Sequence, residues 1–188
     1  GLAAGVVVLM ASTAPVPRLR RHLSIYAPEA HAVTVERIAV DTDVTVVAVP
    51  REDLDDVDVT HLSGERTRAV VDMTNSWEDN VLAPALARDG LSDSAALRRA
   101  WHEAGLEAPI VRAFFDVSHH VLADAGRAAV VAGPGGGSAA ASEARQSLCV
   151  GADDADAGAL IARLVTAMGF EARRCSLDEA KAHEPAAG

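Results

Sequence analysis

The segment that most constrains the fold is a run of β-branched residues that begins at Asp43 and ends at Pro50. Such a short apolar run, closed by a proline, is typical of a strand buried on both faces, as in a parallel sheet covered by helices. In open parallel sheets, ligands bind outside the carboxyl ends of the strands. We therefore expect Ala48, Val49 and Pro50 to line whatever binding site the chain has.

A second buried strand is predicted at residues 69–73, and it leads directly into Thr74, Asn75 and Trp77. The polar end of this strand should open beside the first strand. Periodicity, caps and breakers predict further strands at 5–10, 31–35, 109–114, 128–132, 147–151 and 171–175, and helices at 17–26, 82–87, 92–105, 119–127 and 154–168. Strands alternate with helices throughout, which predicts one α/β domain over residues 1–188 with a mostly parallel sheet and helices on both faces.

Composition narrows the class of partner. The formal net charge of −10 argues against nucleic acid or an anionic membrane surface, and a small molecule is the expected partner. No apolar run is long enough to span a membrane, so a cytoplasmic protein is expected. Cys149 and Cys175 lack the spacing of metal ligands, and we expect two buried thiols rather than a disulfide, and no metal site. The Gly/Ser/Ala-rich stretch at 133–146 is typical of a flexible loop.

Four segments in this order resemble the NADPH-dependent coenzyme F420 reductase family. They are residues 43–50, 70–75, 111–114, and 151–156 with 168–170. The resemblance implies a Rossmann-like dinucleotide-binding fold, NADPH and coenzyme F420 as cofactors, hydride transfer, and a homodimer. It places Ala48, Val49 and Pro50 along the nicotinamide and Thr74 and Asn75 at the side of the same cleft. A flat redox ring needs a small apolar wall with a few fixed polar groups, which agrees with these residue types.

The family's glycine-rich turn is missing, because the sequence contains no Gly-x-Gly-x-x-Gly. Two alignments are possible. In the preferred one, residues 6–12 correspond to the family's second strand and the sequence starts after its first, so that Ser12, Thr13 and Arg18 resemble the residues that recognise the NADPH 2′-phosphate. In the other, residues 5–10 are the first strand. Phe115 also replaces the asparagine that is usual in the family.

His119 and His120 are candidate catalytic residues, because histidine titrates near neutrality and can donate a proton or orient a carbonyl. They are also consistent with an exposed pair at the start of a helix. Three functions stay open: an NADPH-dependent reductase; a non-redox relative that binds or cyclises a small apolar substrate with Phe114, Phe115, Trp77 and the two histidines; and a non-catalytic partner subunit.

Overall fold

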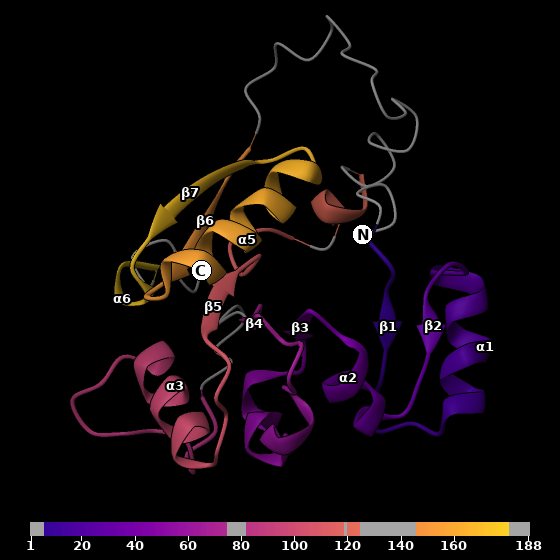
Figure 1. The fold of residues 1–188 in the computed structure, drawn as a ribbon, viewed down its shortest axis with the longest axis horizontal. Coiled ribbons are helices and arrows are strands. Elements are labelled where there is room, and N and C mark those ends of the chain that lie inside the picture. Colours follow the sequence, from indigo (N-terminus) through magenta and orange to yellow (C-terminus); the bar gives the residue numbers. More distant parts are fainter. Residues whose placement is uncertain (1–5, 75–81, 119, 125–145, 181–188) are drawn as a thin grey trace, which may run out of the picture.

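The computed structural model describes residues 6–74, 82–118, 120–124 and 146–180. Within these residues the chain forms a two-stranded and a five-stranded sheet (Figure 1). In the small sheet, β1 (Leu9–Met10) is parallel to β2 (His31–Ala32). The large sheet has the order β3-β4-β5-β6-β7, with bounds Val44–Val47, Ala69–Asp72, Ile110–Ala113, Ser147–Ala152 and Glu171–Cys175. Its β5–β6 pairing is antiparallel and its other three pairings are parallel, so the predicted, mostly parallel α/β sheet is confirmed.

β3, which forms within the β-branched run from Asp43 to Pro50, lies at the edge of the large sheet. Val47 is buried under the helices, but 45% of Val46 is exposed on the opposite face. The expectation that this strand is buried on both faces is therefore wrong, because among the described strands β3 pairs only with β4. Every residue of β4 and β5, which lie inside the sheet, is buried.

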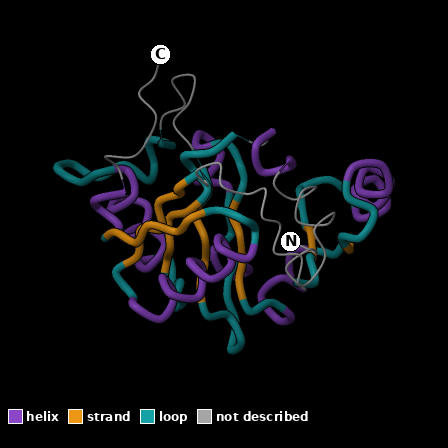
Figure 2. Tube along the Cα trace, turned by 90° about the horizontal axis from the view of Figure 1, so that it is seen from above, coloured by secondary structure: helices purple, strands orange, loops and turns teal. Residues whose placement is uncertain are grey.

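Two long helices cover the large sheet. α3 (Asp93–Glu103) packs with one face through Trp101, and α5 (Ala155–Ala167) packs on the other through Ile161 and Val165. Figure 2 shows helices on both sides of the strands. Each fully buried side chain of this size contributes roughly 1.5–3 kcal/mol by leaving water. The apolar face of α5 thus serves the core of this domain.

The ends of these helices follow the local rules that the sequence suggested. The Asp154 carboxylate accepts the N–H of Ala157 at 2.8 Å, and Gly169, with φ of 94°, follows the end of α5. The Ser92 hydroxyl accepts the N–H of Ala95 at 3.3 Å at the start of α3. Side-chain acceptors at an N-cap satisfy backbone donors that the helix leaves free, and glycine adopts positive φ without steric cost.

The remaining helices are short, except for α1. They are α1 (Val16–Tyr26), α2 (Val35–Asp41), α6 (Leu177–Ala180) and the 3₁₀ segments η2 (Arg51–Asp56) and η3 (Val59–His61). The predicted helix at 82–87 is wrong: the described part, from residue 82, forms turns around Pro84, whose ring nitrogen has no proton to donate. Residues 120–124 are helical, whereas the rest of the predicted helix at 119–127, the strand at 128–132 and nearly all of the loop at 133–146 lie outside the described residues.

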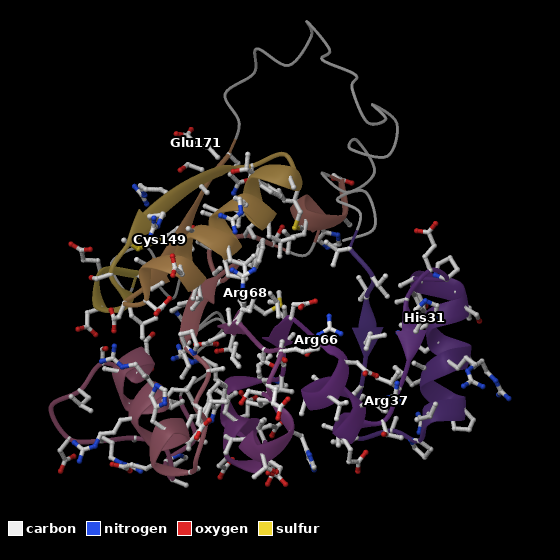
Figure 3. All side chains as sticks on the ribbon, in the orientation of Figure 1. His31, Arg37, Arg66, Arg68, Cys149 and Glu171 are labelled. Carbon is white, nitrogen blue, oxygen red and sulfur yellow. A yellow bond between two sulfur atoms is a disulfide. The ribbon has the colours of Figure 1, made fainter. Side chains whose placement is uncertain are left out.

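The N-terminal sheet is shorter than the predicted strands. Among the described strands, β1 pairs only with β2, through bonds such as that from the N–H of His31 to the carbonyl of Val8 at 2.9 Å. Figure 3 shows His31 in this small sheet, far across the molecule from Cys149 in the large one.

Candidate functional site

The first part of the candidate site is the pair of segments that leave β3 and β4. Val47 and Asp72 are partners in the register, and the N–H of Met73 donates to the carbonyl of Val47 at 3.2 Å. The segments that follow β3 and β4 therefore leave the sheet side by side, as predicted. Ala48, Val49 and Pro50 follow β3 and are exposed, so they form a small apolar wall at the carboxyl end of the strand.

Arg51 directly follows Pro50 and fixes the turn after β3 through contacts with two other segments. Its side chain is fully buried, and its Nη2 lies 3.3 Å from a carboxylate oxygen of Asp93, the first residue of α3. The carbonyl of Arg51 also accepts the N–H of Ala83 at 3.3 Å. An arginine directly after Pro50 thus ties the turn after β3 to two other segments of the chain.

Asp72 organises the segment after β4. Its Oδ1 accepts two hydrogen bonds from Thr74, one from the backbone N–H at 2.9 Å and one from the hydroxyl at 2.7 Å. Thr74 is buried, with 4% of its surface exposed. The hydroxyl proton of this predicted cofactor-binding residue is therefore committed to Asp72, and the two bonds hold Thr74 at the end of β4.

Arg112 is a site residue that sequence reasoning missed. It lies opposite Asp72 in the register of β4 and β5, and its Nη1 donates to Asp72 Oδ2 at 2.5 Å. Both side chains are buried, and the guanidinium lies 4.6 Å from the centre of the Phe115 ring. A single arginine within an apolar strand, facing a single aspartate within the neighbouring one, is the sequence signal that identifies such a pair.

The segment after β5 has an unusual backbone. Phe114 has φ of +65°, and among the described non-glycine residues it alone has a positive φ. Phe114 and Phe115 are both buried, so these rings belong to the core and do not line an open apolar site. Asp116 Oδ2 accepts the backbone N–H of Cys149 at 2.9 Å, which fixes the segment against β6. The carboxylates of Asp72 and Asp116 thus have different hydrogen-bond partners, Arg112 and Thr74 for the first and the Cys149 backbone for the second.

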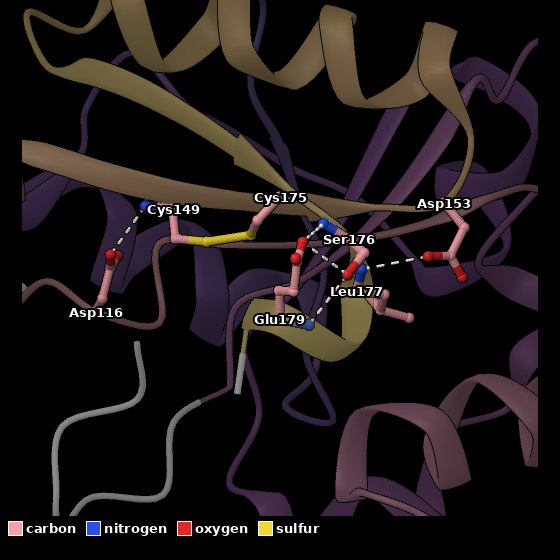
Figure 4. Close-up of a disulfide and its surroundings, with 7 residues drawn as sticks. All are labelled: Asp116, Cys149, Asp153, Cys175, Ser176, Leu177 and Glu179. Carbon is pink, nitrogen blue, oxygen red and sulfur yellow. Dashed lines mark hydrogen bonds between the residues drawn. A yellow bond between two sulfur atoms is a disulfide. The ribbon is translucent and has the colours of Figure 1, made fainter. Parts of the chain in front are cut away.

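Cys149 and Cys175 form a disulfide between β6 and β7 (Figure 4). Their Cα atoms are 6.9 Å apart. The prediction of two buried thiols is therefore wrong. The reason is the register, because Cys175 is the partner of Gly151 and lies diagonally across from Cys149 on the same face of the sheet.

The other predicted residues lie apart from this wall. Ser12 and Thr13 follow β1 and are exposed, and Arg18 is exposed in the first turn of α1. That turn contains no acidic residue, which suits an anion near its N-terminus. His120 is exposed in the helical segment at 120–124.

Three candidates, namely Asn75, Trp77 and His119, lie outside the described residues. Across the part of the chain that is described, no group of three or more metal-ligating side chains occurs, and no helix is long and apolar enough to cross a membrane.

A separate pocket of about 300 Å³ lies at the other end of β5. Its lining includes Arg98, Pro109, Ile110 and Asp153, and Arg98 and Asp153 form an ion pair with each other. Because Ile110 begins β5, this pocket is remote from the carboxyl ends where the sequence places the site. We assign the candidate site to the carboxyl ends, where exposed small residues and fixed polar groups meet.

Comparison with known proteins places the fold. No protein-family model matches the sequence, and no curated protein matches it either. A hypothetical protein, SMa0349, from Sinorhizobium meliloti matches with a TM-score of 0.66 and 19% identity, over 99% of this chain and 82% of that chain. A proposed F420-dependent NADP-reductase from Arthrobacter sp. FB24 matches with a TM-score of 0.61 and 18% identity, over 92% of this chain and 77% of that chain.

The fold is Rossmann-like. The predicted resemblance to the F420-dependent reductases is thus confirmed at the level of the fold. At 18% and 19% identity, these likenesses concern the architecture of the chain.

Proposed function

We propose that this chain is a reductase domain that binds NADPH at the carboxyl ends of β3 and β4, with a deazaflavin such as coenzyme F420 as the hydride acceptor. The observation that carries the proposal is the exposed wall of Ala48, Val49 and Pro50 beside the fixed Thr74 segment. Small apolar residues let a flat ring approach closely, and rigid neighbours hold it in one orientation.

The chain has suitable residues for two parts of NADPH, the nicotinamide and the 2′-phosphate, but lacks the usual motif for the pyrophosphate. The wall suits the nicotinamide, and Ser12, Thr13 and Arg18 supply hydroxyl groups and a cation for a 2′-phosphate. The sequence contains no Gly-x-Gly-x-x-Gly motif, which brings backbone N–H groups against a pyrophosphate in dinucleotide-binding folds. When bound, NADPH supplies the hydride, and the task of the protein is to orient the ring and exclude water.

The buried ion pair between Arg112 and Asp72 supports the orientation of the ring by fixing the segment that follows β4. Arg112 holds the Asp72 carboxylate, which in turn holds the backbone and the hydroxyl of Thr74. We assign Asp72 and Arg112 as positioning residues that hold Thr74 in place. His119 and His120 stay candidates for the group that donates a proton to the reduced acceptor.

A second candidate function is favoured by the missing glycine turn. A relative without dinucleotide binding would use the same wall to hold a different small molecule. Because Phe114 and Phe115 are buried, these two rings are not available to an apolar substrate, and Ala48 and Val49 would have to provide apolar contact.

Calorimetric titration of the purified chain with NADPH tests the proposal, with the intact mass checked first. We expect saturable binding that Ala48→Phe weakens by about tenfold or more, because the larger side chain occupies the space of the ring. Asn75→Ala should also weaken binding. Ala167→Phe, at an exposed alanine at the end of α5, is the matched control and should bind as the parent chain does.

Absence of saturable NADPH binding to the parent chain refutes the reductase proposal and favours the second candidate. Equal affinities of the Ala48→Phe variant and its Ala167→Phe control place the nucleotide elsewhere. The homodimer and the cytoplasmic location stay predictions, and size-exclusion chromatography with light scattering tests the first of them.

A further inference from the structure

The disulfide lies at the junction of three segments. Cys149 is buried in β6, Cys175 is the last residue of β7, and both pack with Phe115 and Ala180 in one cluster. Phe115 belongs to the segment that follows β5, and Ala180 belongs to α6. The bond between the two sulfurs therefore holds together the chain around the end of β5, on the face of the sheet opposite to α5.

The connection to β5 is direct. Asp116 accepts the N–H of Cys149 through Oδ2, while its buried Oδ1 has no hydrogen-bond partner among the described residues. Phe115 lies between the cysteine cluster and the guanidinium of Arg112. Arg112 in turn holds Asp72. A continuous set of contacts thus runs from the disulfide to the buried pair behind the candidate site.

The connection to α6 is equally tight. Ser176 and Glu179 form a capping box in which the Glu179 carboxylate accepts the N–H of Ser176 at 2.8 Å (Figure 4). A Cβ on Gly151 would lie 2.6 Å from the Cβ of Ala180, so α6 sits almost in contact with β6. Because α6 starts two residues after Cys175, the disulfide fixes the point from which this helix begins.

We propose that the Cys149–Cys175 disulfide is a reversible redox switch that controls the order of the segment after β5 and of α6. Cys175 is only partly buried, so its sulfur is the one open to attack by a thiolate from a dithiol reductant. That attack forms a mixed disulfide at Cys175 and releases Cys149 as a thiolate, which takes up a proton.

The reaction is balanced by the second thiol of the reductant. It attacks the mixed disulfide and leaves as a cyclic disulfide, and Cys175 becomes a thiol; the reductant is oxidised by two electrons and the protein is reduced by two. The new thiol of Cys149 is a donor on the residue that Asp116 Oδ2 already contacts, and Asp116 Oδ1 has no hydrogen-bond partner among the described residues. Disulfides with an exposed cysteine are more readily reduced than buried ones, which agrees with the partial exposure of Cys175.

Alkylation and hydrogen exchange of the full chain test the switch. Without reductant, N-ethylmaleimide should add no label to the folded chain. After dithiothreitol under native conditions it should add two labels, because the sequence contains two cysteines. Exchange at residues 114–118 and 177–180 should then become about tenfold or more faster. Residues 16–26 of α1, which pack with the small sheet, serve as the internal control and should not change.

A Cys149→Ser, Cys175→Ser chain should exchange as the reduced parent does, with or without dithiothreitol. Two labels before reduction, no label after native reduction, or labels with unchanged exchange each overturn the proposal. An effect on the NADPH site rests on the proposed function: reduction should then lower the affinity for NADPH. If neither form binds NADPH, the proposed function fails, while the exchange data still decide the switch.

Discussion

Replacing Arg112 with methionine tests whether the buried ion pair holds the end of β4 in place. The Arg112 and Asp72 side chains are 0% and 2% exposed, and Nη1 lies 2.5 Å from Oδ2. Methionine keeps much of the apolar stem but leaves the carboxylate buried, with the two bonds from Thr74 as its remaining hydrogen bonds among the described residues. Loss of one partner from a buried pair costs about 3–5 kcal/mol. For a chain of this size, that lowers the melting temperature by roughly 6–20 °C.

The matched control is an exposed pair of the same residue types. Arg66 Nη2 lies 3.2 Å from Asp43 Oδ2, with side chains 61% and 63% exposed (Figure 3 labels Arg66). Arg66→Met should cost at most about 1 kcal/mol, because water screens the pair and already solvates both charges. Guanidinium unfolding followed by circular dichroism measures both variants, with thermal unfolding as the second assay.

A double variant separates charge from volume. Asp72→Asn together with Arg112→Met removes both charges of this buried pair, and asparagine still accepts the hydrogen bonds of Thr74. We expect the double variant to be more stable than the Arg112→Met chain. The reasoning is refuted if Arg112→Met costs no more than the exposed control, or if the losses of the two single variants simply add in the double variant.

Two further predictions concern helix ends. Asp154→Ala should lower the free energy of unfolding by about 1 kcal/mol, because the N–H of Ala157 loses its cap, while Asp154→Ser should restore most of it; equal stability of all three chains contradicts the capping role. Hydrogen bonds from Arg99 and then Arg88 hold the pKa of Glu103 below its ordinary value of 4.5. The Glu103 carboxylate therefore stabilises the folded chain above pH 4.5, and this contribution is lost as the pH falls through the lowered pKa. The difference in stability between the parent chain and Glu103→Gln should shrink on acidification. Thermal unfolding at a series of pH values measures this difference, and a difference that grew at low pH would contradict the prediction.

Local interactions explain why parts of the fold were predictable. The start of α5 at Asp154 and its end at Gly169 depend on a side chain three residues away and on one backbone angle, both of which belong to the local sequence. The turns around Pro84 were mistaken for a helix because the apolar spacing of Leu82 and Leu86 is helical. Leu82 is instead buried in the core on the α3 side, where tertiary packing outweighs periodicity.

The candidate site was predictable in part for the same reason. Ala48, Val49 and Pro50 follow a strand whose parallel neighbour ends beside it, and the topology rule requires only the order of strands. The sequence does not show that Arg112 lies across from Asp72, because the two residues are 40 positions apart. Nor does it show that β3 is an edge strand, since exposure of Val46 depends on which strands pair with it.

By itself, then, the sequence determined the α/β alternation, the long helices with their caps, and the carboxyl ends at which polar and small residues gather, because each depends on contacts within a few residues along the chain. The tertiary structure alone decided the register. It is the register that pairs Asp72 with Arg112, buries Phe115 and brings Cys149 to Cys175 across 26 positions. Such contacts join residues far apart in the chain, and only the packing of the sheet determines which side chains meet.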